Sequence, residues 1–194
     1  MAIVRDGMGH VVQRLRENCS LGYSDYTLVG TDYWTDAQIQ GYADEYVEVL
    51  KRIPLSAFPI ESDGTLYYYH YEIPMKWLEN NTSGTSYFRL YNGVGSAIGT
   101  ADYTFDAVNG HVEFAADTAG SIYYADIRHY PIDEISAQIW MLKIAHISAN
   151  SFNIRMDNHT FNRNQRIEQY TKMMDFYRNK VGASSKRIIR GDMS

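Results

Sequence analysis

Cysteine is nearly absent from this sequence, which excludes two kinds of site. Cys19 is the only cysteine among 194 residues. A single thiol forms neither an internal disulfide nor a cysteine-based metal site, so we interpret Cys19 as a small buried side chain. No two histidines stand in an HxxxH or HxH pair, and we therefore expect no metal and no cofactor. The histidines are His10, His70, His111, His129, His146 and His159.

Long hydrophobic runs are also missing. No window approaches the roughly 18 uncharged apolar residues of a membrane-spanning helix. The apolar stretch at the N-terminus is interrupted by Arg5, Asp6, His10 and Arg14, which predicts that it is not a signal peptide. We therefore expect a soluble protein that is synthesised in the cytoplasm and has no membrane partner.

Positive charge is scarce in most of the chain and concentrated at its C-terminal end. Residues 1–150 hold 9 Lys and Arg against 19 Asp and Glu, a net charge of −10, whereas residues 151–194 hold 9 against 4, a net charge of +5. This split indicates that the basic end meets an acidic partner, which is a neighbouring copy, another protein or nucleic acid. The alternative is a solvated helix face that happens to be basic.

The start of one helix is marked clearly. Thr35 is placed to cap it, and Gln38, three residues on, can reach back to the cap in a capping box. Trp34 and Ile39 occupy the two positions of a hydrophobic staple. The apolar period of three and four continues through Val49, so we expect this helix to run toward the proline breakers near residue 54.

Three further helices are predicted by the same period. They cover Met8 to Cys19, Pro131 to about Asn150, and Asn162 to Gly182. The third helix of the chain carries apolar residues on more than one face and should be the most buried. Residues 183–194 are small, polar and basic and have no core of their own, so we expect them to order only on a partner.

Between Thr65 and Tyr130 the apolar period changes to two. Runs rich in Tyr, Phe, Val and Ile are separated by Gly, Asn, Ser and Asp, which is typical of antiparallel strands. Asn109-Gly110 predicts a tight hairpin, because both residues accept positive φ. A sheet with one packed face and one face available to a partner is expected. The runs are Leu66 to Ile73, Tyr87 to Tyr91, Asp102 to Phe105, His111 to Phe114 and Ser121 to Arg128.

Motifs that would indicate catalysis are weak. Gly93 to Gly99 is similar to a dinucleotide loop, but its last glycine is one position late and a strand is expected after it, so we interpret it as a mobile β loop. His111-Val112-Glu113 has zinc-deaminase spacing without the paired cysteines, and alternation along a strand explains it better. Asp126 and His129 lack a nucleophile, which favours a structural hydrogen bond. We expect no catalytic residues and no enzyme activity.

Three motifs stand in a fixed order along the chain. An aromatic-Thr/Ser-Asp-x-Glu/Gln-aliphatic run lies at Trp34 to Ile39, a long apolar helix at Ile135 to Ser148, and a polar stretch with a last helix at Phe152 to Val181. This order resembles the head-to-tail connector (adaptor) proteins of tailed phages, in which these motifs open the second helix and form the third and fourth. The hairpin pattern of residues 103–114 is similar to hairpins in many phage structural proteins. The β insertion is larger than in the plainest family members.

The resemblance implies a single α+β connector domain over residues 1–194. It consists of a four-helix connector-type helical domain at 6–60 and 131–182, an inserted antiparallel β module at 64–130 between helices 2 and 3, and a flexible basic arm at 183–194. Such subunits form a ring, usually of twelve copies, beneath the portal in the virion neck. The ring links the capsid to a stopper or tail protein. Genomic DNA passes through its channel without sequence-specific binding, which an acidic lumen would favour.

The resemblance also implies where the portal binds. The C-terminal helix and tail of connector proteins often engage the portal, so the expected portal-binding residues lie in the basic arm. They are Lys186, Arg187, Ile188, Ile189 and Arg190.

Two alternatives remain open. The nearer one is another tail or neck component, such as a tail-completion, stopper or baseplate subunit. The remoter one is a carbohydrate-binding or hydrolytic domain that uses the Tyr-rich sheet. Hydrolysis would require two carboxylates from among Glu72, Glu113 and Asp126 to face each other across a cleft.

Overall fold

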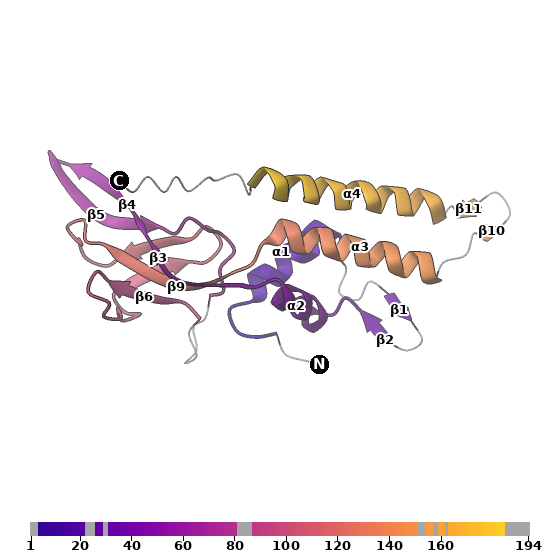
Figure 1. Ribbon diagram of the computed structural model, residues 1–194, viewed down its shortest axis with the longest axis horizontal. Coiled ribbons are helices and arrows are strands. Elements are labelled where there is room, and N and C mark those ends of the chain that lie inside the picture. Colours follow the sequence, from indigo (N-terminus) through magenta and orange to yellow (C-terminus); the bar gives the residue numbers. More distant parts are fainter. Residues whose placement is uncertain are drawn as a thin grey trace, which may run out of the picture. The chain divides into compact units, whose positions relative to one another are not determined.

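Helices and antiparallel strands both contribute to this α+β chain (Figure 1). The computed structural model describes residues 4–21, 26–28, 31–80, 87–150, 154–156, 159–161 and 163–184. The chain divides into two units, Met1–Glu17 with Leu21–Pro131, and Asn18–Ser20 with Ile132–Ser194. In the part of the chain that the structure describes, no helix is long and apolar enough to cross a membrane.

The helices and strands follow one another in this order: α1 (Gly9–Cys19), β1 (Tyr26–Leu28), β2 (Thr31–Tyr33), α2 (Asp36–Glu45), β3 (Glu48–Pro54), β4 (Ser56–Ser62), β5 (Thr65–Glu72), β6 (Arg89–Asn92), β7 (Tyr103–Asp106), β8 (His111–Phe114), β9 (Tyr123–His129), α3 (Ile132–Asn150), β10 (Ile154–Met156), β11 (His159–Phe161) and α4 (Arg163–Ser184).

The capped start of α2 confirms the sequence prediction. The Thr35 hydroxyl accepts from the backbone N–H of Gln38 at 3.3 Å, and the Gln38 side chain accepts from the N–H of Thr35 at 2.9 Å. Trp34 and Ile39, the two staple positions, are buried. The backbone N–H groups of Thr35 and Gln38, which have no partner within the helix itself, are therefore both hydrogen-bonded.

The predicted end of α2 is wrong. The helix stops at Glu45, and residues 48–54 form β3, which pairs antiparallel with β9. Leu50 and Ile53 pack against the core of the sheets, while Val49 is 58% exposed. The predicted apolar period therefore describes a helix only as far as Glu45, and Val49 belongs instead to a strand that has a bulge between Leu50 and Ile53. Pairing with a distant strand overrides local propensity here.

Two antiparallel sheets of the first unit share one core. Their strand orders are β3-β9-β6 and β4-β5-β8-β7. Tyr71, Val112 and Phe114 from the four-stranded sheet lie in the same buried cluster as Leu90 and Ile127 from the three-stranded sheet. The inner faces of the two sheets therefore pack on each other, as in a β-sandwich. The five predicted strands are confirmed, but β4 was not predicted.

The turn between β7 and β8 is longer than we predicted. Only Gly110 has positive φ, at 76°, and the loop spans residues 107–110. The Asp106 carboxylate organises the loop by accepting from the backbone N–H of Val108 at 3.0 Å and from the Asn109 amide at 2.8 Å. A Cβ atom on Gly110 would lie 2.3 Å from the carbonyl oxygen of Met75, so only glycine fits.

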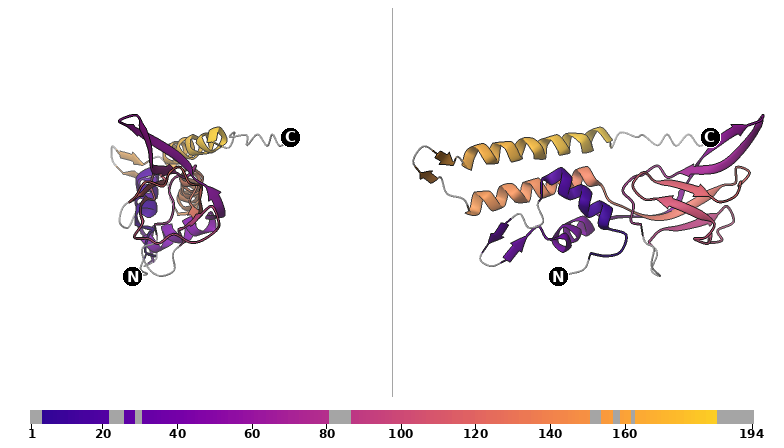
Figure 2. Two further views of the ribbon diagram at one scale, coloured as in Figure 1. Left: turned by 90° about the vertical axis from the view of Figure 1, so that its left-hand side faces the viewer. Right: turned by 180° about the vertical axis from the view of Figure 1, so that it is seen from behind.

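The second unit consists mainly of α3 and α4, which run antiparallel side by side (Figures 1 and 2). Trp140 packs on Tyr170 with ring centroids 4.9 Å apart, and Lys180 pairs with Asp133 at 3.7 Å. The predicted third and fourth helices are confirmed, although α4 passes the predicted stop at Gly182 and ends at Ser184. Its expected cap, Asn162, lies outside the described residues. Two short antiparallel pairs, β1-β2 and β10-β11, complete the described strands.

Candidate functional site

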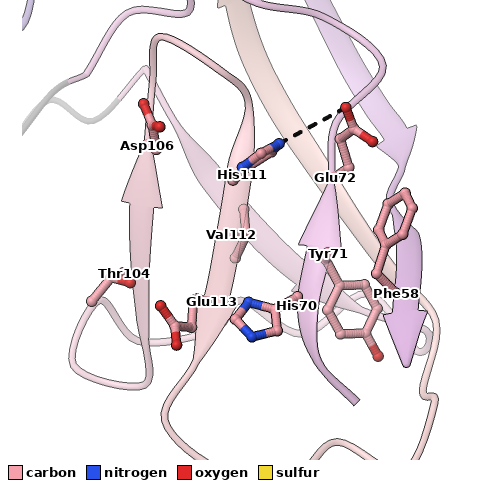
Figure 3. A pocket seen from close by; sticks show the side chains of 9 residues that line it. All are labelled: Phe58, His70, Tyr71, Glu72, Thr104, Asp106, His111, Val112 and Glu113. Atoms are coloured by element: carbon pink, nitrogen blue, oxygen red, sulfur yellow. Dashed lines mark ion pairs between the residues drawn. The ribbon is translucent and has the colours of Figure 1, made fainter. Parts of the chain in front are cut away.

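The outer face of the four-stranded sheet carries a cluster of ionisable side chains (Figure 3). Side chains alternate between the two faces of a strand, so Tyr71 and Val112 point into the core and their neighbours point outward. Together with Phe58 on β4, these outward side chains surround an open depression of about 550 Å³. The term outer face is used below for Phe58, His70, Glu72, Thr104, Asp106, His111 and Glu113.

The strand register places histidines beside carboxylates in two rows. In one row His111 lies between Glu72 and Asp106 on the adjacent strands. In the next row Glu113 is paired with His70. Cross-strand partners on one face lie close enough to interact, and opposite charges across strands are favourable.

The first row continues to Ser56 on β4, and the second row runs from Phe58 on β4 to Thr104 on β7. His111 Nε2 lies 3.9 Å from Glu72 Oε1, and Figure 3 shows the two side chains turned toward each other. Each row therefore crosses all four strands of the sheet.

The outer face is acidic when its two histidines are neutral. It then holds three carboxylates, on Glu72, Asp106 and Glu113, and none of the described residues that line the depression is Lys or Arg. The amide of Asn109 and two backbone N–H groups hold the pKa of Asp106 below its ordinary value. This carboxylate is therefore kept ionised by the loop that follows its strand.

The outer face combines polar side chains with one aromatic side chain. Carboxylates and imidazoles supply acceptors and donors, and half-exposed Phe58 supplies an aromatic contact. Among the described residues, no group of three or more His, Cys, Asp or Glu is arranged to hold a metal ion.

Of the residues singled out from the sequence as candidate catalytic groups, His111 and Glu113 share the outer face, whereas Asp126 and His129 have separate partners. His111 and Glu113 alternate with buried Val112 along β8, as expected. Asp126 does not meet His129, because its carboxylate accepts from the backbone N–H of Arg52 at 2.8 Å and the Tyr91 hydroxyl at 3.2 Å. His129 Nδ1 lies 3.1 Å from Glu48 instead.

The three carboxylates named for the hydrolytic alternative do not share one surface. Glu72 and Glu113 lie on adjacent strands of the four-stranded sheet. Asp126 belongs to β9 of the other sheet. The Gly93 to Gly99 loop follows β6 and leads into no helix, so it lacks the helix N-terminus of a dinucleotide site. The expected portal-binding residues, Lys186 to Arg190, lie outside the described residues.

A buried charge cluster was missed by the sequence analysis. The side chain of Glu79 is fully buried and accepts from Arg5 Nε at 2.7 Å and from the Tyr130 hydroxyl at 2.8 Å. Arg5 also pairs with Asp44 on α2 at 2.7 Å, and Arg128 lies 3.7 Å from Glu79. We call Arg5, Asp44, Glu79, Arg128 and Tyr130 the Arg5–Glu79 cluster.

Ionisation within the Arg5–Glu79 cluster is fixed by its contacts. The hydrogen bond from Arg5 to Asp44 raises the pKa of the guanidinium. Burial and the hydrogen bond to Glu79 raise the pKa of the Tyr130 hydroxyl. Burial alone would raise the pKa of Asp44, but the hydrogen bond and charge of Arg5 hold it below its ordinary value. The cluster ties the N-terminal segment and α2 to the end of β9, which is a structural role.

A second missed cluster lies in the second unit. Lys143 is buried and donates to the carbonyl oxygens of Cys19 at 3.0 Å and Ser20 at 3.5 Å. Trp140 Nε1 and the Tyr177 hydroxyl donate to the carbonyl of Asn18 at 3.3 and 3.2 Å. These carbonyl groups lie at the C-terminal end of α1, where a helix offers them no N–H partner. The ammonium of Lys143 and the donors of Trp140 and Tyr177 take that place. This site is also structural.

Comparisons with protein-family models, curated proteins and solved structures found no match to this chain.

Proposed function

We propose that this chain is a non-enzymatic structural subunit of a tailed-phage virion, a head-to-tail connector that assembles into a ring beneath the portal. The observation that supports the proposal is the order of elements. Two short helices come first, a β-sandwich is inserted after α2, and the long antiparallel pair α3 and α4 follows. This is the order that the connector resemblance implies, with a β insertion that begins earlier, at β3.

Exposed apolar side chains on α3 and α4 are consistent with assembly. Phe176 on α4 is 50% exposed, and Met141 on α3 is 41% exposed. Rings are built from heterologous contacts, in which one surface of a subunit meets a different surface of the next. An acidic body with a basic C-terminal end supplies two such unlike surfaces. Repulsion between acidic bodies should keep the isolated chain a monomer or weak oligomer until a portal organises it.

Native mass spectrometry of the chain, alone and mixed with the portal of the same phage, tests this function. A closed ring of twelve 22.3-kDa chains would add about 270 kDa to the portal. We expect this mass only in the mixture or at high concentration, and no added mass with an unrelated acidic protein of similar size. A tight, salt-insensitive dimer that does not bind the portal would refute the proposal. Binding to an isolated tail or baseplate protein instead would assign the chain to another neck or tail position.

Carbohydrate binding is a second candidate, favoured by one observation. The rings of Tyr67 and Tyr69 on β5 stack with centroids 6.0 Å apart and are partly exposed. Aromatic pairs of this kind offer a flat apolar surface with polar edges. Isothermal titration with the surface glycans of the phage host tests it. Saturable heat that is lost in Tyr67→Ala and retained in Tyr42→Phe would favour this candidate over the connector.

A further inference from the structure

The outer face of the four-stranded sheet has the chemistry to hold a basic segment with an apolar side chain. Three carboxylates surround the depression, and Phe58 is 50% exposed beside it. Ile60, two residues further along the same edge strand, is 47% exposed. A surface with both properties suits an occupant whose cations flank an aliphatic anchor.

The C-terminal segment of this chain has that composition. Residues 185–194, which follow α4, hold Lys186, Arg187 and Arg190 against one acid, Asp192, and the paired Ile188 and Ile189 lie between the cations. Charge and apolar character therefore match the outer face in kind. Extended, the ten residues that follow α4 span up to about 35 Å, whereas four strands lie about 14 Å from first to last, so the segment is long enough to cross the whole sheet.

We infer that the outer face is the docking site for residues 185–194 of a second copy of this chain. The inference rests on the proposed ring, because a head-to-tail contact of this kind can repeat from copy to copy and close. Each copy would offer its outer face to one neighbour and its C-terminal segment to the other. This assignment gives the segment a different partner from the portal contact that the family resemblance implies.

Two full-length variants that each lose one side of the contact provide the test. The face variant carries Glu72→Gln and Glu113→Gln, and the segment variant carries Lys186→Gln, Arg187→Gln and Arg190→Gln. Glu17→Gln is the matched control, since it removes an exposed carboxylate on α1, which is not part of the four-stranded sheet. Self-association is measured by sedimentation over a range of concentration and salt.

Each variant alone should associate at least tenfold more weakly than the wild type and the Glu17→Gln control. A mixture of the two should form a dimer of one copy each and stop there, because one intact face meets one intact segment and no further contact is possible. Association should weaken with salt, as expected for charge pairs. Both variants should keep the circular dichroism spectrum of the wild type, which shows that a loss of association is not a loss of folding.

The outcomes separate this inference from the proposed function. If both variants associate as the wild type does and still join the portal ring, the inference fails and the connector function stands. If the segment variant alone loses the portal while the face variant keeps it, the segment belongs to the portal and the inference fails. A wild-type chain that never joins a portal contradicts the connector function whatever the variants do.

Discussion

Glu79 is the residue whose loss should destabilise the first unit most. Its side chain has 0% exposed surface, yet it carries a carboxylate that accepts hydrogen bonds from Arg5 and Tyr130. In Glu79→Leu, Arg5 keeps Asp44 but loses its second carboxylate, and the Tyr130 hydroxyl loses its 2.8 Å acceptor in a buried position. Arg128 also loses its carboxylate at 3.7 Å, and the Tyr130 hydroxyl keeps only the longer hydrogen bond to Asp44 at 3.3 Å.

The size of the loss follows from these contacts. Removing one partner of a buried ion pair costs about 3–5 kcal/mol, because the other charge stays buried without compensation. Because Arg5 is 27% exposed and keeps its ion pair with Asp44, we expect the free energy of unfolding to fall by an amount at the lower end of this range, about 3 kcal/mol. For a chain of this length each kcal/mol lowers the Tm by about 2–4 °C, so we expect a fall of about 6–12 °C.

Thermal and urea unfolding of the single and double variants test this account. Arg5→Met alone should also destabilise, since it leaves Glu79 charged and buried. Arg5→Met with Glu79→Leu should cost less than the sum of the two single changes, because the charges are removed together. Glu48→Gln, which alters a half-exposed carboxylate on β3, is the control and should change the Tm little. Strict additivity of the two changes would refute the assigned pairing.

Three smaller predictions concern single positions. Thr35→Ala should lower the free energy of unfolding by about 1 kcal/mol, because it removes the helix cap. Trp34→Ala should lower it by about 3–5 kcal/mol, because it removes a buried side chain. Both values are measured from urea midpoints, and equal, negligible effects would contradict the assigned cap. Gly110→Ala should lower the free energy of unfolding by more than about 2 kcal/mol, because the new Cβ clashes with the Met75 carbonyl and the backbone has positive φ. A Tm within about 1 °C of wild type would contradict this prediction. Burial lowers the pKa of His10 below its ordinary 6.5. As the pH falls below 6.5, the imidazole of the unfolded chain therefore binds a proton before that of the folded chain does, and the folded state loses stability. His10→Gln should remove that part of the slope of Tm against pH, and an unchanged slope would contradict it.

Helices were the most predictable part of this fold. The amphipathic period located α1, α3 and α4 within a few residues, and the Thr35 capping box fixed the first residue of α2. Both signals are local, since they depend on residues three or four positions apart. The end of α2 was not predictable in this way, because β3 exists through its pairing with β9, about 75 residues further along the chain.

Strand β4 shows why an exposed edge strand escapes a pattern search. All seven residues from Ser56 to Ser62 are exposed, so they show no apolar alternation, and Pro59 reads as a breaker. A proline is tolerated there because an edge strand leaves some of its N–H groups unpaired. Only pairing with β5 identifies this segment as a strand.

The outer face could be predicted only in part, for the same reason. Alternation along β8 placed His111 and Glu113 on one face from the sequence alone. Their neighbours Glu72 and His70 come from β5, about 40 residues earlier, and β6, which lies between them in sequence, joins the other sheet. A row of histidine and carboxylate is thus a property of sheet register, which no local pattern encodes. Glu72 and Glu113 are far apart in the sequence, yet the pairing of β5 with β8 brings both carboxylates to one surface.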